Sequence, residues 1–263
     1  FDFCNRVFKL GDGSTRVEAD AAGMVIVKGS SHNVFRRNSC LCGGDGIFLC
    51  GYEHPGNILP CNYNLFEGND CRLSPNNAIE STFSGFNTYR NNNVSQSNYG
   101  FWMGYSYSNT LEYNTVELNR FMGFAIEHAF DFDIVNNRIK QNGEGVRLWT
   151  RGGAVTDYFP NRRVTYNFRL SGNEFESNRI GFVGDTGEHT TEDSSHHFTL
   201  TNNTFRDSRV GAFFGRVRDC KLDNNHFERN VVAAIERRSA YRHGVAIGSS
   251  NVYKGNTTDL LET

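Results

Sequence analysis

One repeating unit, clearest in residues 121–150, constrains the fold of this chain more than any other feature. It holds two short segments that begin with glycine, at 123–128 and 145–150, and an asparagine pair between them, Asn136 and Asn137. The second asparagine recurs along the chain with a basic step of 22 to 23 residues and several longer steps. Self-similarity at a fixed period is typical of a stacked architecture. We assign the recurring position to Asn38, Asn69, Asn92, Asn114, Asn137, Asn173, Asn203, Asn225 and Asn256.

Apolar side chains flank these asparagines with the alternation of strands that bury one face. Three residues before them stand Phe35, Phe66, Tyr89, Leu111, Ile134, Leu170, Leu200, Leu222 and Tyr253. Two residues after them stand Cys40, Cys71, Val94, Val116, Ile139, Phe175, Phe205 and Phe227. A further strand begins at glycines such as Gly100, Gly123 and Gly145. Each period therefore predicts about three short strands and no helix.

This pattern predicts an all-β protein: one right-handed parallel β-helix domain over residues 1–263, with about nine to ten coils and an asparagine ladder. Equal positions of successive coils would stack about 4.8 Å apart. An asparagine there tolerates left-handed φ, and its amide can bond the same group on the next coil. Over about residues 24–256 the chain resembles the β-helix repeat proteins of the pectate-lyase-like superfamily. The resemblance implies the fold but no single activity, since that superfamily contains lyases, hydrolases, epimerases, esterases, tailspikes and copper-maturation proteins.

Composition narrows the class of partner. The net charge of -2 gives no basic surface for nucleic acid, and no apolar run reaches the roughly 18 residues of a membrane span. The first residue is not methionine, so we expect a processed or trimmed product. Seven cysteines favour an oxidising compartment, and we expect a secreted or periplasmic protein.

The cysteines themselves have structural interpretations. Cys40 and Cys71 hold equal inward positions, where they would stack as thiols or form a disulfide. A disulfide between Cys50 and Cys61 would close the first insertion.

Four insertions interrupt the repeat, each about twelve residues after a ladder asparagine. They cover about residues 51–60, 150–163, 185–194 and 237–245. All four leave the coil at the end of the same strand, so we expect their loops to wall a groove along the stack.

The outward side chains of that strand would form the floor of the groove. The first outward column is Phe48, Glu80, Trp102, Ala125, Arg147, Val183, Phe213 and Glu236. The second is Cys50, Thr82, Gly104, Glu127, Trp149, Asp185, Gly215 and Arg238. Tryptophan beside carboxylates is a common way to hold sugar rings, so we expect a polysaccharide or oligosaccharide substrate.

Paired carboxylates make glycoside hydrolysis the leading hypothesis. Glu127 and Asp185 would lie two coils apart in one column, near the roughly 6.5 to 9.5 Å carboxylate spacing of inverting enzymes. Glu80 is the alternative partner. The residues expected to bind substrate are Trp102, Trp149, Arg147, His128, Tyr158, His54 and Glu236.

Other functions stay open. Elimination or C5 epimerisation of a uronic acid would use Arg147 as the cation and His128 or Tyr158 as the base, although the floor carries more acid than base. A non-catalytic carbohydrate-binding or surface protein is a second alternative. Copper delivery predicts clustered Met and His ligands, whereas the three Met residues are scattered. No metal-ligand spacing is present, so we expect neither metal nor cofactor. A homo-oligomer also stays open.

Overall fold

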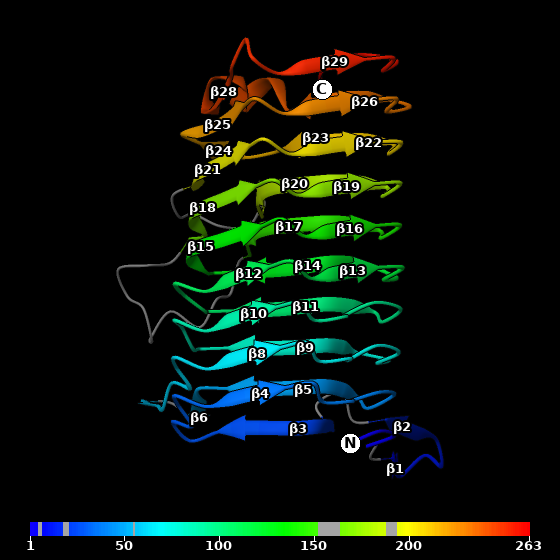
Figure 1. Cartoon of the computed structure of the whole chain (residues 1–263), viewed down its shortest axis with the longest axis vertical. Helices are drawn as coiled ribbons and strands as arrows, with labels where there is room; N and C mark the ends of the chain where they lie inside the picture. The colour runs from blue at the N-terminus through cyan, green and yellow to red at the C-terminus, as the bar shows by residue number, and fades with distance from the viewer. Residues whose placement is uncertain (5–6, 18–20, 55, 152–163, 188–193) are drawn as a thin grey trace.

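The computed structural model describes residues 1–4, 7–17, 21–54, 56–151, 164–187 and 194–263, and it shows a column of stacked coils with the N-terminus at one end (Figure 1). Nearly all ladder pairs are parallel, so the predicted parallel β-helix is confirmed. Its three sheets run along the column. Two antiparallel hairpins lie outside them, β1 (Val7–Lys9) with β2 (Thr15–Val17) and β6 (Tyr52–His54) with β7 (Asn57–Ile58).

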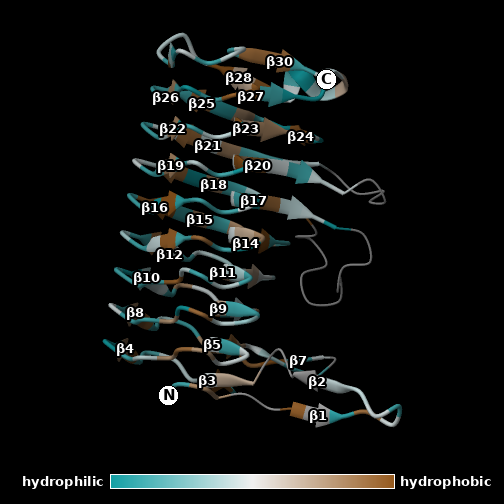
Figure 2. Cartoon of the chain, turned by 90° about the vertical axis from the view of Figure 1, so that its right-hand side faces the viewer, coloured by the Kyte–Doolittle hydropathy of each residue, from teal (hydrophilic) through white to brown (hydrophobic). Residues whose placement is uncertain are grey.

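Sheet 1 contains the strands whose outward residues were predicted to form the floor. In spatial order its strands are β3 (Ala22–Val27), β5 (Asp45–Cys50), β9 (Asn77–Thr82), β11 (Tyr99–Gly104), β14 (Met122–Glu127), β17 (Glu144–Thr150), β20 (Ile180–Thr186), β23 (Val210–Phe214), β27 (Ala233–Arg237) and β30 (Leu260–Glu262). Figure 2 shows β9, β11, β14, β17 and β20 as successive rungs that end on the same side. The predicted insertions begin at the ends of β5, β17, β20 and β27, so all four leave from one corner. The last contains the short 3-10 helix η1 (Ser239–Gly244).

Sheets 2 and 3 complete each coil. Sheet 2 consists of β4 (Val34–Arg36), β8 (Leu65–Glu67), β10 (Thr88–Arg90), β12 (Thr110–Glu112), β15 (Phe130–Val135), β18 (Tyr166–Ser171), β21 (Ser195–Thr201), β24 (Val217–Arg218), β25 (Cys220–Asp223) and β28 (Val245–Ile247). Sheet 3 consists of β13 (Thr115–Glu117), β16 (Arg138–Lys140), β19 (Glu174–Glu176), β22 (Thr204–Arg206), β26 (His226–Glu228) and β29 (Val252–Lys254). The predicted inward side chains fill the space between the sheets, where Phe175, Phe205 and Phe227 stack at 4.4 and 4.9 Å.

The asparagine ladder forms by amide to amide bonding between coils. The backbone N and Nδ2 of Asn114 both donate to Oδ1 of Asn137, at 2.9 and 3.0 Å. Nδ2 of Asn114 also donates to the carbonyl oxygen of Tyr89. The left-handed φ falls one residue earlier than expected, for example at Asn136 with φ 53°. The ladder asparagine thus supplies the bonds, and its neighbour supplies the turn.

Asn256 was assigned to the wrong ladder. Asn225 donates to Asn251, whereas Asn256 accepts from Asn230 in a second ladder five residues further along each coil. The two ladders use the same residue type and the same bonds, so an isolated asparagine near an insertion fits either. Tyr253 accordingly pairs with Phe227 and belongs to the column after the asparagine, not before it.

The expected disulfide between Cys50 and Cys61 does not form, since both thiols are free. The hairpin is closed instead by backbone bonding, in which the Leu59 N–H donates to the Gly51 carbonyl at 2.7 Å. The Cys61 thiol turns into the core. Cys40 and Cys71 are also free and buried, in neighbouring positions of adjacent coils.

Candidate functional site

The register of sheet 1 brings together the two outward columns expected from the sequence. Glu80 pairs with Trp102, Trp102 with Ala125, and Ala125 with Arg147 in the first column. This column continues through Val183 and Phe213 to Glu236. In the second column Gly104 pairs with Glu127, Glu127 with Trp149, and Trp149 with Asp185.

Aromatic rings cover the middle of sheet 1. The indoles of Trp102 and Trp149 meet edge to face, with centroids 5.8 Å apart, and Ala125 is fully buried on the strand between them. The ring of Tyr99 lies 5.1 Å from Trp102, and the guanidinium of Arg147 lies 5.8 Å from the ring of Trp149. Both indoles are half-buried, so this cluster gives the coils from β11 to β17 a partly exposed aromatic surface.

Glu127 is the most perturbed acid of the site. Its side chain is only 2% exposed, and this burial raises its pKa to about 7, while the charge of Arg151 offsets part of the rise. The Nε of Arg151 lies 2.7 Å from Oε2 of Glu127, an ion pair without the alignment of a hydrogen bond. A carboxyl group with a pKa near neutrality is suited to giving and taking protons.

Glu127 and Asp185 lean toward opposite ends of the column. A Cβ placed on Gly104, one coil before Glu127, would lie 3.6 Å from Oε1 of Glu127. A Cβ placed on Gly215, one coil after Asp185, would lie 2.1 Å from Oδ1 of Asp185. The backbones are two strand spacings apart, about 9.6 Å, so the carboxylates are separated by more than this. The geometry therefore does not favour these two residues as a pair that shares one glycosidic bond.

Polar bonds hold Asp185 and Glu80 in place. The backbone N–H groups of Thr186 and Arg216 donate to Oδ1 of Asp185 at 2.8 and 2.9 Å. Asn77 Nδ2 donates to Oε2 of Glu80 at 2.6 Å. Glu80 lies in the other column from Glu127, which separates the two side chains further.

A cavity of about 290 Å³ opens beside Arg147, toward the C-terminal end of sheet 1. Predicted residues Arg147, Asp185 and Glu236 line it. It also contains Glu144, Arg179 and Arg209, which the sequence reasoning missed. Glu144 directly precedes the glycine taken as the start of its strand, in the same outward column as Tyr99 and Met122. Tyr99, Met122 and Glu144 each stand directly before a strand-starting glycine. This recurring outward position is the sequence signal that could have identified Glu144.

Of the other residues predicted to bind substrate, His128 and His54 do not line the cavity. His128 is buried, stacks on Tyr105 at 5.1 Å, and accepts a hydrogen bond at Nε2 from the Arg151 backbone N–H. It is placed to support Arg151 rather than to contact a polymer. His54 is exposed on the β6–β7 hairpin, several coils away on the N-terminal side. Tyr158 lies outside the described residues.

No group of three His, Cys, Asp or Glu side chains able to hold a metal ion occurs in the part of the chain that the structure describes. Over the same residues, no helix is long and apolar enough to cross a membrane.

Comparisons with known proteins give one family and several similar folds. A family model described as "Periplasmic copper-binding protein (NosD)" matches residues 15–191. Among curated proteins, none matches this sequence. The A-module of mannuronan C-5 epimerase AlgE6 from Azotobacter vinelandii has a TM-score of 0.65 at 16% identity, over 89% of this chain and 72% of that chain.

Two further solved structures share the fold. The AlgE4 A-module from the same organism has a TM-score of 0.58 at 13% identity, over 90% of this chain and 75% of that one. The catalytic domain of Agl-KA has a TM-score of 0.57 at 16% identity, over 83% of this chain but only 45% of its own.

Proposed function

The chain belongs to the right-handed parallel β-helix family described as periplasmic copper-binding protein (NosD), and from its own site we propose that it is a carbohydrate-active enzyme. It cleaves a polysaccharide that lies along sheet 1, and Glu127 transfers the proton. The observation that carries the proposal is the buried Glu127 carboxyl, which has a pKa of about 7 and pairs in register with the half-buried Trp149, whose indole contacts that of Trp102. The family description supports a periplasmic location.

Copper does not fit the described residues. The family description implies the metal, but the chain offers no group of three His, Cys, Asp or Glu ligands in the ranges described. Met103 is fully buried in the core, and Met24 packs against that core three coils away. We therefore derive no step through copper.

The ion pair of Glu127 and Arg151 favours elimination over hydrolysis. Hydrolysis needs a second carboxylate on the same bond, and Asp185 leans away from Glu127. Elimination needs a base and a cation that neutralises the carboxylate of a uronic acid. Arg151, whose side chain is 56% exposed, lies 2.7 Å from Glu127 and can supply that charge.

The elimination step balances with these groups. The Glu127 carboxylate takes the proton from C5 of the uronic acid, and the electrons of that C–H bond form the double bond between C4 and C5. The bond from C4 to the glycosidic oxygen then breaks, and the leaving oxygen takes up a proton. After it has taken the proton from C5, Glu127 can give that proton to the leaving oxygen.

The test is to incubate the protein with neutral and uronic-acid polysaccharides and to measure new reducing ends and the ultraviolet absorbance of the new double bond. Elimination gives both signals, and both disappear in Glu127→Gln. Glu112→Gln, a matched change on sheet 2, keeps them. Reducing ends without absorbance would establish hydrolysis, with Asp185 or Glu80 as the partner acid. No new ends from any polymer would overturn the proposal.

A further inference from the structure

The cavity beside Arg147 carries more positive than negative charge, the reverse of what the sequence suggested for the floor. Its lining arginines are Arg147, Arg179, Arg209 and Arg238. Its lining acids are Glu144, Asp185 and Glu236. The whole chain has a net charge of -2, so this local excess of cations runs against its overall composition.

Glu144 binds and orients two of these arginines, Arg147 and Arg179. Its side chain is 8% exposed, and both of its oxygens accept hydrogen bonds from Nη1 of Arg147, at 3.0 and 2.8 Å. Nη2 of Arg179 donates to Oε1 of Glu144 at 3.1 Å. A buried acid held in this way fixes the guanidinium groups before a ligand arrives, which lowers the entropy cost of binding.

Arg179 and Arg209 occupy equal positions on adjacent coils. The Arg179 N–H donates to the carbonyl of Asn142, and the Arg209 N–H donates to the carbonyl of Asn178 on the next coil. Their backbones are therefore about 4.8 Å apart. Both side chains are exposed and both line the cavity, so this edge of it carries one arginine on each of two successive coils.

The floor between the charged groups is apolar. Val183 and Phe213 are neighbours in the first outward column, and the guanidinium of Arg238 lies 6.0 Å from the ring of Phe213. An apolar floor bordered by guanidinium groups suits a sugar ring that carries an anionic group. The ring can pack on the apolar floor, and one guanidinium can donate two parallel hydrogen bonds to two oxygens of the anionic group.

We propose that this cavity is a subsite for the anionic group, carboxylate or sulfate, of a sugar residue in the bound polymer. The inference rests on the proposed action on a polysaccharide and adds the direction of binding. The polymer extends from Glu127 on β14 across β17 and β20 toward β27, and it carries acidic groups on residues that do not react. In the turns that precede β5 and β9, the positions equivalent to Arg179 and Arg209 hold Gly44 and Asn76 instead of arginine.

Binding to matched polymers tests the subsite. All measurements use the full chain with Glu127→Gln, which keeps the polymers intact. Kd is measured for polygalacturonate against highly methyl-esterified pectin, and for dextran sulfate against dextran. Arg179→Ala with Arg209→Ala should weaken binding of the charged polymers about tenfold or more, since a hydrogen bond to a charged group contributes that much. Binding of the neutral polymers should not change.

Arg138→Gln is the matched control. Arg138 lies on sheet 3, is 58% exposed and pairs with Glu117, whereas Arg179 is 57% exposed and pairs with Glu144. The control should bind every polymer as the parent protein does. A preference for polygalacturonate or for dextran sulfate identifies the anionic group as carboxylate or sulfate.

Two results would overturn the subsite: unchanged Kd values in the double variant, or equal losses for charged and neutral polymers. Cleavage of a polymer by the parent protein, which has Glu127, together with either result would leave the proposed function standing. Selective loss of binding to the charged polymers, with no cleavage of any polymer by the parent protein, would support the subsite and refute the enzyme.

Discussion

Trp102 and Trp149 meet edge to face at 5.8 Å although they belong to strands two coils apart. Their contact depends on Ala125, the residue of β14 that pairs with Trp102 on one side and with Arg147 on the other. Ala125 has the smallest side chain of that column and is completely buried, so it leaves room for the two indoles to meet above it. The aromatic surface of the site is therefore built around one small residue.

A larger side chain at Ala125 should separate the indoles. Ala125→Leu is expected to weaken polysaccharide binding by about tenfold, because sugar stacking depends on the joint surface of both rings. Tryptophan fluorescence reports the change directly, since the chain has only two tryptophans. Val25→Leu, in the same column at the N-terminal end and 56% exposed, is the control and should change neither fluorescence nor Kd. Unaltered fluorescence in Ala125→Leu would contradict the contact.

The raised pKa of Glu127 should appear in both activity and stability. If Glu127 is the base, the cleavage rate rises with pH through about 7, whereas a general acid would give the opposite slope. Between about pH 4.5 and about pH 7, Glu127 of the folded protein still holds a proton that the unfolded chain has released. The free energy of unfolding should therefore decrease as pH rises from about 4.5 to about 7, by at most about 3 kcal/mol.

Glu127→Gln provides the control for that slope. The variant should lack this part of the pH dependence and should be the more stable protein above pH 7. Urea unfolding at several pH values measures the difference. Equal slopes for parent and variant would mean that Glu127 does not hold a proton near neutral pH.

The opposite lean of Glu127 and Asp185 gives a matched pair of glycine substitutions. Gly104→Ala should be tolerated, because the new Cβ would lie at an ordinary contact distance, 3.6 Å, from Glu127. Gly215→Ala would place a Cβ 2.1 Å from the Asp185 carboxylate and should displace it from the N–H groups of Thr186 and Arg216. We expect a loss of about 1 to 3 kcal/mol of unfolding free energy for Gly215→Ala alone. Similar melting temperatures for the two variants would contradict the assigned lean.

The sequence was sufficient to predict the coils and the outward columns, because burial in a β-helix enforces strict alternation along every strand. Glu80, Trp102 and Arg147 accordingly lie in one column as expected. Alternation places a side chain on a face but does not determine its rotamer. The opposite directions of the Glu127 and Asp185 side chains were therefore not predictable. They depend on the space that Gly104 leaves beside Glu127 and that Gly215 leaves beside Asp185.

The cavity was missed for a different reason. Arg179 and Arg209 stand in the turns that precede β20 and β23, and Glu144 is the first residue of β17. The strands predicted from the sequence begin at the glycine that follows each of these positions, so the predicted outward columns do not include them. The excess of arginine in the cavity arises from turn residues, which strand periodicity does not describe.

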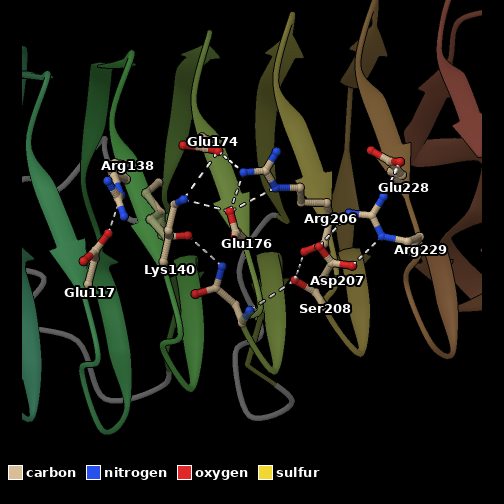
Figure 3. A network of polar contacts seen from close by, with 12 residues as sticks. Glu117, Arg138, Lys140, Glu174, Glu176, Arg206, Asp207, Ser208, Glu228 and Arg229 are labelled. Atoms are coloured by element: carbon tan, nitrogen blue, oxygen red, sulfur yellow. Dashed lines mark hydrogen bonds and ion pairs between the residues drawn. The ribbon is translucent and has the colours of Figure 1, made fainter.

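Sheet 3 carries a ladder of alternating charge that should contribute to register and acid stability. Along one outward column run Glu117, Lys140, Glu176, Arg206, Glu228 and Lys254. Figure 3 shows Glu176 between Lys140 and Arg206, both of which bond to it. A one-coil slip would place like charges together, so the alternation favours the observed stacking.

The bonds from Lys140 and Arg206 lower the pKa of Glu176 to about 2. A carboxylate with a depressed pKa contributes stability above its unfolded value, near 4.5, and this contribution is lost as pH falls toward 2. Glu176→Gln should therefore destabilise the protein by about 1 kcal/mol at pH 7, after screening at this partly exposed site, and by nothing near pH 2. Thermal melts at both pH values, with and without about 1 M salt, measure the difference. A loss that is the same at both pH values would assign the effect to packing rather than to charge.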